Sequence, residues 1–183
     1  MKKEFADEFV NHLVRLKNSD RGAMAALRHS LAFPPGDYPK AYPYVEHWVG
    51  ADCDPRAAMR LALYAVAGFF AAHPEIHERS LAGALGKLLA DKKRPSLELR
   101  FRALLEADGE GLLQHLRQAV SLLASETLGF NHSALLRDLC ILLDGRVPEL
   151  RDDVRRRWAR QFYGALSSTA DAAVSSDSAS QPT

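Results

Sequence analysis

The chain of 183 residues is long enough for one or two small domains, each with a hydrophobic core. Its composition is typical of a soluble protein, and 24 lysines and arginines nearly balance 23 aspartates and glutamates. Because the first residues are charged and no apolar run approaches the roughly 20 residues of a membrane helix, we expect neither a signal peptide nor a membrane span. Cys53 and Cys140 lie far apart in no recognisable pattern, so we expect reduced thiols and a cytoplasmic protein.

Helical periodicity dominates the N-terminal half of the chain. Apolar residues recur on one stripe over residues 4–17, and Asp20 is expected to cap a second helix that ends near Leu31. The proline-rich segment 33–39 must break that helix. A short helix is expected over residues 43–49.

The following helices are predicted from capping residues and apolar spacing. Asp54 followed by Pro55 predicts the start of a helix that runs to about Ala72, because proline is favoured in the first turn. Ser96 and Asn131 are expected to cap later helices. The remaining predicted helices cover residues 80–90, 96–107, 110–124, 132–143 and 148–163.

No segment alternates apolar and polar residues as a half-buried strand does. The sequence therefore predicts an all-α protein, a two-lobed helical bundle of about eight or nine helices. We place an N-terminal helical lobe at residues 1–90 and a C-terminal helical lobe at residues 91–163. Residues 164–183 are rich in Ser, Ala, Asp and Thr, so we expect a disordered tail there.

No arrangement of residues in the sequence suits catalysis. His73 and His77 are four residues apart, but a zinc-protease motif needs glutamate directly after the first histidine. The segment 83–87 is too short for a phosphate-binding loop, and no Ser or Thr follows Lys87. Cys140 lies among apolar neighbours and is expected to be an inert thiol. We therefore expect no enzyme activity, no metal and no cofactor.

The predicted last helix is strongly basic. Within residues 151–160 it carries five arginines: Arg151, Arg155, Arg156, Arg157 and Arg160. Five basic minus two acidic residues leaves a net charge of +3 on this segment. At 100° per residue one face is apolar, and it holds Leu150, Val154, Trp158 and Phe162. The arginines are therefore expected to be exposed on the flanks and back of the helix, with Trp158 and Phe162 in the core.

Two further basic sets precede this helix. Residues 79–102 carry seven basic and two acidic residues, a net charge of +5, and their centre is predicted to be a turn between helices. In such a turn the side chains can reach along a nucleic-acid backbone. The candidate binding residues of this set are Lys87, Lys92, Lys93, Arg94, Arg100 and Arg102. The third set is Arg21 and Arg28, seven residues apart and so on one helical face.

Three local basic sets in a chain of net charge +1 favour binding to a polyanion, most often nucleic-acid phosphate. From the last helix, the candidate binding residues are Arg151, Arg155, Arg156 and Arg160. No signature that reads base edges is present, so we expect backbone contacts without sequence preference. The alternative is a helical protein–protein scaffold whose arginines pair with acidic partner surfaces.

Four blocks of the sequence, in their order and spacing, resemble the CasB family, the small subunit of the type I-E CRISPR Cascade complex. They are ALRHSLAFPPG with YPYV at 26–36 and 42–45, SLAGAL at 80–85, RF, LLEAD and LRQAV within 100–120, and WARQFY at 158–163. The resemblance extends over roughly residues 5–163. In one departure from the family, this chain has Arg28-His29 where many relatives have paired basic residues.

The resemblance implies a helical, two-lobed, non-catalytic subunit that works in two copies inside a ribonucleoprotein. The partners it implies are CRISPR RNA, target DNA, and the backbone and large subunits of the complex. There the subunit would line the filament of backbone subunits on the CRISPR RNA. Its implied role is to stabilise the target R-loop, including the displaced strand, in antiviral defence.

Overall fold

The computed structural model describes residues 1–50, 53–54 and 56–177, with side chains as far as Leu166. Over these residues the chain is all-α, and no strand forms. The only β-type pairing among them is an isolated bridge between Ile76 and Phe130. The predicted fold class is therefore confirmed.

Two long helices and one short helix form the N-terminal part of the bundle. Asp20 caps the second helix as predicted, and its Oδ1 accepts a hydrogen bond of 2.8 Å from the Ala23 N–H. The proline-rich segment ends this helix and leads into a 3-10 turn, a short helix and a second 3-10 turn. The bounds are α1 (Lys3–Ser19), α2 (Arg21–Ser30), Pro39–Ala41, α3 (Tyr42–Val45) and Glu46–Trp48.

The next helix, α4 (Ala58–Ala72), begins later than predicted. Asp54 does not cap it. Its carboxylate instead accepts a hydrogen bond of 2.7 Å from the Arg56 N–H, which closes a tight turn ahead of the helix. The predicted first helical residue, Pro55, lies outside the described residues.

Four helices follow, and one of their two predicted caps is correct: the Asn131 side chain accepts from the Ala134 N–H at 2.8 Å. Ser80, for which no cap was predicted, accepts from the Gly83 N–H at 3.1 Å. The prediction for Ser96 is wrong, because Pro95 occupies the first turn and moves the helix start upstream. The bounds are α5 (Leu81–Lys92), α6 (Pro95–Glu106), α7 (Gly109–Ser125) and α8 (His132–Leu142).

The last helix, α9 (Pro148–Asp177), is longer than the predicted segment 148–163. Residues 165–177 contain four alanines and no proline or glycine, so no helix-breaking residue ends the helix there. The expectation that nothing packs after Tyr163 is also corrected, because Leu166 contacts the core. Residues 178–183 lie outside the described part of the chain.

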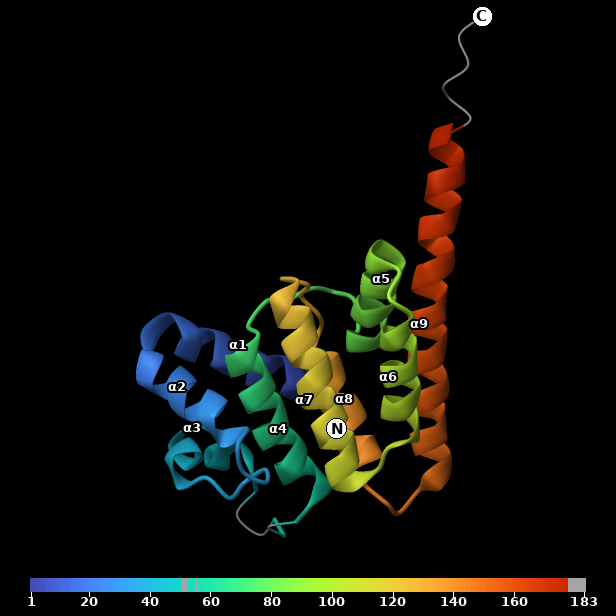
Figure 1. Cartoon of the computed structure of the whole chain (residues 1–183). Coiled ribbons are helices and arrows are strands. Elements are labelled where there is room, and N and C mark those ends of the chain that lie inside the picture. Colours follow the sequence, from blue (N-terminus) through green and yellow to red (C-terminus); the bar gives the residue numbers. More distant parts are fainter. Residues whose placement is uncertain (51–52, 55, 178–183) are drawn as a thin grey trace, which may run out of the picture.

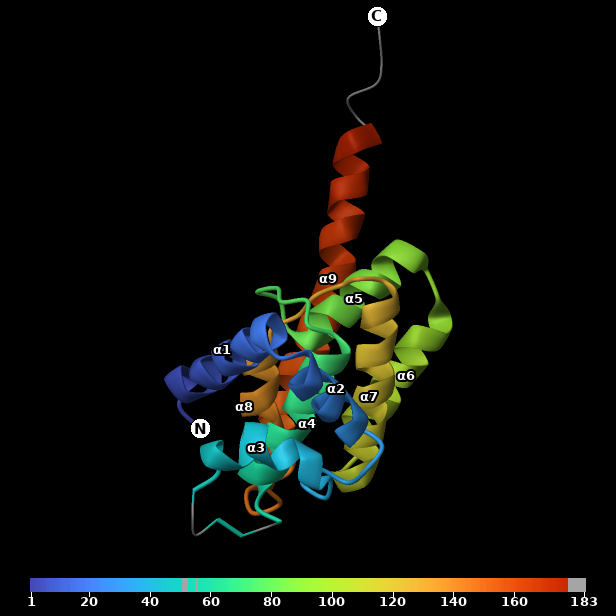
Figure 2. The same cartoon turned by 90° about the vertical axis from the view of Figure 1, so that its left-hand side faces the viewer.

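The helices form three groups around one continuous core (Figures 1 and 2). In Figure 1, α4, α7 and α8 lie in the middle, α1 to α3 on one side, and α5, α6 and α9 on the other. Helix α8 packs on α1 and α4, although it comes much later in the chain. Helices from both sides of residue 90 thus share a core, and the division into two lobes there stays a prediction. No described helix has the length and apolarity to cross a membrane.

The apolar stripe of α9 packs against α5 and α6. Trp158 and Phe162 are buried, which confirms their predicted core role, and the Phe162 ring stacks on Phe101 at 3.9 Å between centroids. Gly86 of α5 lets the α9 backbone approach closely, since a Cβ there would lie 2.2 Å from the Phe162 carbonyl oxygen. Leu150 departs from the prediction: it is 48% exposed near the start of α9.

Candidate nucleic-acid interface

The turn between α5 and α6 presents the centre of the second basic segment. Lys93 ends α5 in the left-handed conformation, with a φ of 49°, and Arg94 is the N-cap residue of α6. Lys92, Arg94 and Arg100 meet around one small hollow of about 80 Å³. Lys93, Arg94 and Arg100 are exposed, and within the described part of the chain none of the three forms an ion pair.

Two lysines of the same segment have carboxylate partners. Lys92 pairs with Glu126 at the end of α7, and Lys87 pairs with Asp91 one turn further along α5, each with an N–O distance of 2.9 Å. These side chains are partly exposed, and ion pairs of this kind contribute about 0–1 kcal/mol. Both lysines can therefore exchange their carboxylates for phosphate at little cost.

The basic residues continue from α6 to α9. The Tyr163 hydroxyl of α9 donates a hydrogen bond of 3.1 Å to Glu98 of α6, so the two helices are in contact here. Burial and Glu98 raise the pKa of Tyr163, and the nearby charge of Arg102 opposes the rise. Arg102 and Arg160 are exposed, and neither is ion-paired within residues 1–50, 53–54 and 56–166. We call Lys93, Arg94, Arg100, Arg102 and Arg160 the unpaired basic surface.

Arg151 and Arg155 were expected to be exposed, and the structure corrects this expectation. Their side chains are 19% and 25% exposed, and both guanidinium groups converge on the carboxylate of Asp108. Arg155 also donates to the Ala107 carbonyl oxygen at 3.2 Å. Partial desolvation acts to raise the pKa of Asp108, but the two arginines outweigh it and hold the pKa below its usual value. These two ion pairs hold the start of α9 against the turn before α7.

The next two arginines of α9 also have partners. Arg156 pairs with Asp153 at 2.6 Å, and both side chains are exposed. Arg157 pairs with Asp138 of α8, and the Trp158 indole N–H donates to the same carboxylate at 2.6 Å. Of the four arginines proposed on this helix, Arg160 is thus the one without a carboxylate partner among the described residues.

The acidic partners of these arginines were not predicted from the sequence. The partner role of Asp138 could have been predicted, because a charged residue between Leu136 and Leu139 in an apolar helix is rarely buried without a partner. The sequence around Asp108 does not indicate such a role. An acidic residue just before a helix is common, since it favours the positive end of the helix dipole.

The third basic set lies apart from the other two. Arg21 and Arg28 are on α2, on the opposite side of the molecule from α5, α6 and α9 (Figure 1). Arg21 is exposed at the start of the helix. Arg28 donates from Nε to the Ala71 carbonyl oxygen at 2.9 Å and so also closes the end of α4. The three predicted sets therefore do not form one surface.

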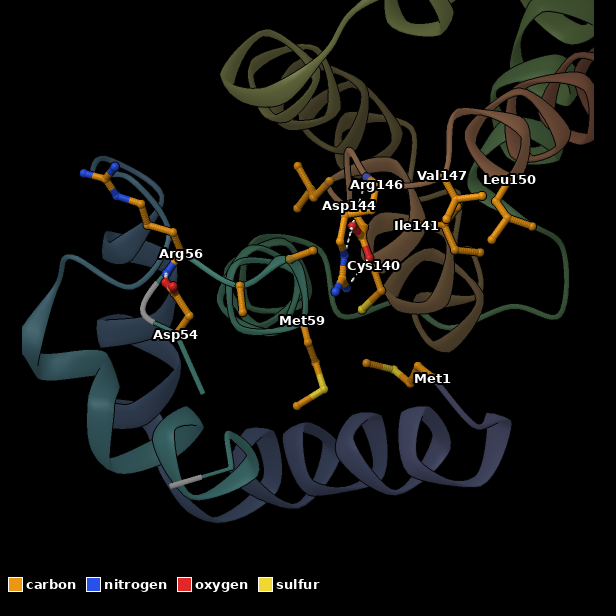
Figure 3. Close-up of a pocket in the computed structure, with 13 residues that line it drawn as sticks. Met1, Asp54, Arg56, Met59, Cys140, Ile141, Asp144, Arg146, Val147 and Leu150 are labelled. Atoms are coloured by element: carbon orange, nitrogen blue, oxygen red, sulfur yellow. Dashed lines mark hydrogen bonds and ion pairs between the residues drawn. The ribbon is translucent and has the colours of Figure 1, made fainter. Parts of the chain in front are cut away.

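One large hollow in the described part of the molecule does not resemble a substrate site (Figure 3). It has a volume of about 610 Å³ and lies between α4, the end of α8 and the start of α9. Apolar side chains such as Met59, Val147 and Leu150 line much of it. Its Asp144 and Arg146 pair with each other at 2.7 Å. No cluster of polar groups converges on its centre as a small substrate would require.

His73, His77 and Cys140, which were singled out in the sequence, each have a different environment. His73 is buried and its Nε2 bonds the Leu128 carbonyl oxygen at 2.8 Å, whereas His77 is exposed and accepts from the Arg79 N–H. No group of three or more potential metal ligands occurs among the described residues. Burial raises the pKa of Cys140 to about 11, so its thiol stays protonated and inert near neutral pH.

Comparison with known proteins identifies relatives along most of the chain. The sequence profile of the family described as CRISPR-associated protein Cse2 matches residues 23–163. A Cse2 protein of Thermus thermophilus is 42% identical over 163 residues, which cover 87% of this chain and 90% of that protein. The crystal structure of CasB from Thermus thermophilus superposes with a TM-score of 0.73 at 41% identity, covering 87% of this chain and 97% of that one. A chain of a CRISPR RNA-guided surveillance complex superposes with a TM-score of 0.77 at 27% identity, covering 93% and 98%.

Proposed function

The chain belongs to the CRISPR-associated Cse2 family, also called CasB, and we propose that it is a non-catalytic subunit of a type I-E RNA-guided surveillance complex. Its proposed partners are CRISPR RNA, target DNA, the backbone and large subunits, and a second copy of itself, in the cytoplasm. The likeness to a chain of such a complex, at 27% identity over 93% of this chain, supports this assignment.

The proposed role of the chain is to bind the nucleic-acid backbone without sequence preference. The observation that carries this proposal is the unpaired basic surface: five cations on three adjacent elements of a chain whose net charge is only +1. Lys87 and Lys92 extend it. Arg21 and Arg28 offer a separate contact on α2, and Arg151, Arg155 and Arg156 contribute only where phosphate displaces their carboxylates.

This role suits the energetics of RNA-guided recognition. Pairing of the guide with its target replaces one duplex by another of nearly equal free energy, so modest protein–phosphate contacts can decide the outcome. A surface that contacts only phosphate accepts every target sequence. Base pairing then supplies all of the specificity.

A salt titration of the isolated full chain tests the proposed role. We compare a surface triple variant, Lys93→Gln/Arg94→Gln/Arg100→Gln, with an α1 triple variant, Lys2→Gln/Lys3→Gln/Arg15→Gln, which removes the same charge from exposed residues elsewhere. The slope of log affinity against log salt should fall by about 0.9 per lost phosphate contact on duplex and about 0.7 on single strands for the surface variant alone. Equal slopes for both variants would contradict the role of this surface.

The alternative function is a protein–protein scaffold that does not touch nucleic acid. The apolar hollow beside α9, with Val147 and Leu150 43% and 48% exposed, favours an additional protein contact at the opposite end of that helix. The same titration separates the two functions, because a pure scaffold binds neither single- nor double-stranded nucleic acid at low salt.

A further inference from the structure

Three aromatic rings gather on the surface where α2 ends. Phe33 and Tyr38 are stacked, with centroids 4.9 Å apart and planes inclined by 15°. The His29 ring lies 5.7 Å from Phe33 and 5.1 Å from Tyr38, so each ring contacts both others. We call these three residues the aromatic cluster.

The cluster presents aromatic surface to solvent. Phe33 is 39% exposed, His29 is also exposed, and Tyr38 is half-buried beneath them. A single exposed aromatic residue is ordinary in a folded protein, but three rings in mutual contact, two of them exposed, form a continuous aromatic surface. Such a surface is suited to an additional planar ring.

The loop that carries Phe33 and Tyr38 is held in place from within. The buried Arg60 donates to the Gly36 carbonyl oxygen at 3.4 Å and pairs with Glu46, Nε to Oε1, at 3.2 Å. Gly36 has a φ of +88°, and a Cβ there would lie 2.2 Å from an Arg60 nitrogen, so the turn requires glycine. The aromatic cluster is therefore positioned before any ligand arrives, which lowers the entropic cost of binding.

Positive charge lies beside the cluster. Arg117 of α7 lines a hollow together with Phe33, and its buried Nε has no hydrogen-bond partner among the described residues. Arg28 precedes His29 on α2 and is exposed, with its Nε engaged at the end of α4. Aromatic faces next to cations match the bases and phosphates of a nucleic-acid strand, whereas an apolar peptide would leave the arginines unmatched.

We propose that His29, Phe33 and Tyr38 form a stacking platform for an unpaired base of single-stranded nucleic acid, with Arg28 and Arg117 next to it for phosphate. A single strand is required because a duplex buries the faces of its bases. This inference rests on the proposed function in one respect only: both assume that the ligand is a nucleic acid. The platform lies at the end of α2 and in the loop that follows, apart from α5, α6 and α9, and its three rings contact a base.

The test compares Phe33→Leu with the wild-type full chain. Leucine keeps apolar bulk but removes the ring face. Fluorescence anisotropy is measured with labelled oligothymidine, with oligouridine, and with an abasic strand of equal length that retains the phosphates. Stacking is worth about 1–3 kcal/mol per base, so Phe33→Leu should bind both base-containing strands at least about fivefold more weakly. Binding of the abasic strand, and the salt dependence, should stay at wild-type values.

Tyr42→Leu is the matched control, since Tyr42 is 36% exposed but lies outside the cluster. Phe33→Trp gives a direct readout, because its indole fluorescence should be quenched by oligothymidine and not by the abasic strand. Thermal unfolding of each variant checks the fold. Equal affinity of Phe33→Leu and wild type for the base-containing strands, with no quenching of Phe33→Trp, overturns the platform. Absence of wild-type binding to every strand would instead overturn the proposed function.

Discussion

At the scale of single residues, buried polar groups fix the position of the arginine helix. The Asp138 side chain is 11% exposed, and it accepts from both Arg157 and the Trp158 indole. Burial raises the pKa of Asp138, and the bonds from Trp158 and Arg157 oppose that rise. The three residues thus combine a core contact with an ion pair, and α9 cannot rotate without breaking both.

Asp138→Ala should therefore destabilise the protein strongly. It leaves the indole N–H and the Arg157 guanidinium without their shared acceptor, and removing one partner of a buried pair costs about 3–5 kcal/mol. We expect the lower end, about 3 kcal/mol, because Arg157 is 42% exposed and can turn to water. Urea denaturation measures the loss. The control is Asp153→Ala, whose exposed pair with Arg156 should contribute less than about 1 kcal/mol.

His132 should make the fold sensitive to acid. Burial, with a smaller contribution from His73, lowers the pKa of His132 to about 3, whereas the unfolded chain has the ordinary value of 6.5. Between these values the unfolded state binds a proton that the folded state does not, so stability falls as pH falls below about 6.5. The free energy of unfolding should fall by about 1.4 kcal/mol for each pH unit in this range. Urea denaturation between pH 7 and 5 should show a flatter dependence for His132→Gln, and an unchanged dependence would contradict the assignment. His115→Gln, at a half-buried position, is the control.

At the scale of helices, periodicity and capping residues predicted most elements, and the errors have local causes. The start of α4 and the Ser96 cap were wrong because a tight turn at Asp54 and a proline at position 95 overrode the expected caps. The length of α9 was underestimated because the helix propensity of alanine extends this helix beyond its large apolar residues. Each error lies at an element boundary, where several local arrangements differ little in free energy.

The contact of α5 with α9 predicts opposite effects at two glycines of one helix. Gly86→Ala places a Cβ 2.2 Å from the Phe162 carbonyl oxygen, so the helices must separate, at a cost of about 1–3 kcal/mol. Gly83→Ala meets the Ser80 hydroxyl at 3.4 Å and the Arg79 Cβ at 3.9 Å, both ordinary contacts, and should be neutral, or stabilising by up to about 1 kcal/mol. Thermal unfolding of both variants measures the difference. A Gly86→Ala protein as stable as Gly83→Ala would show that the close approach is not required.

At the scale of the whole molecule, the fold decides which basic residues remain free. The sequence located all three basic sets, but it could not indicate that Asp108 pairs with both Arg151 and Arg155, which lie 43 and 47 residues away along the chain. The stronger candidates for phosphate binding are therefore on the α5–α6 turn and α6 and not on the arginine helix, because the cations of the turn and α6 lack carboxylate partners in the described residues. A chain of net charge +1 thus keeps five exposed cations without carboxylate partners on the α5–α6 turn, α6 and α9, within the described residues.

Retention of target DNA by the reconstituted surveillance complex tests the central claim most directly. Complexes are assembled with the wild-type chain, the surface triple variant or the α1 triple variant, loaded with target DNA and washed at increasing salt. The surface triple variant should assemble normally and release DNA at clearly lower salt than wild type, because it lacks phosphate contacts. The α1 triple variant should match wild type. Equal retention in all three complexes would contradict a nucleic-acid role for the unpaired basic surface.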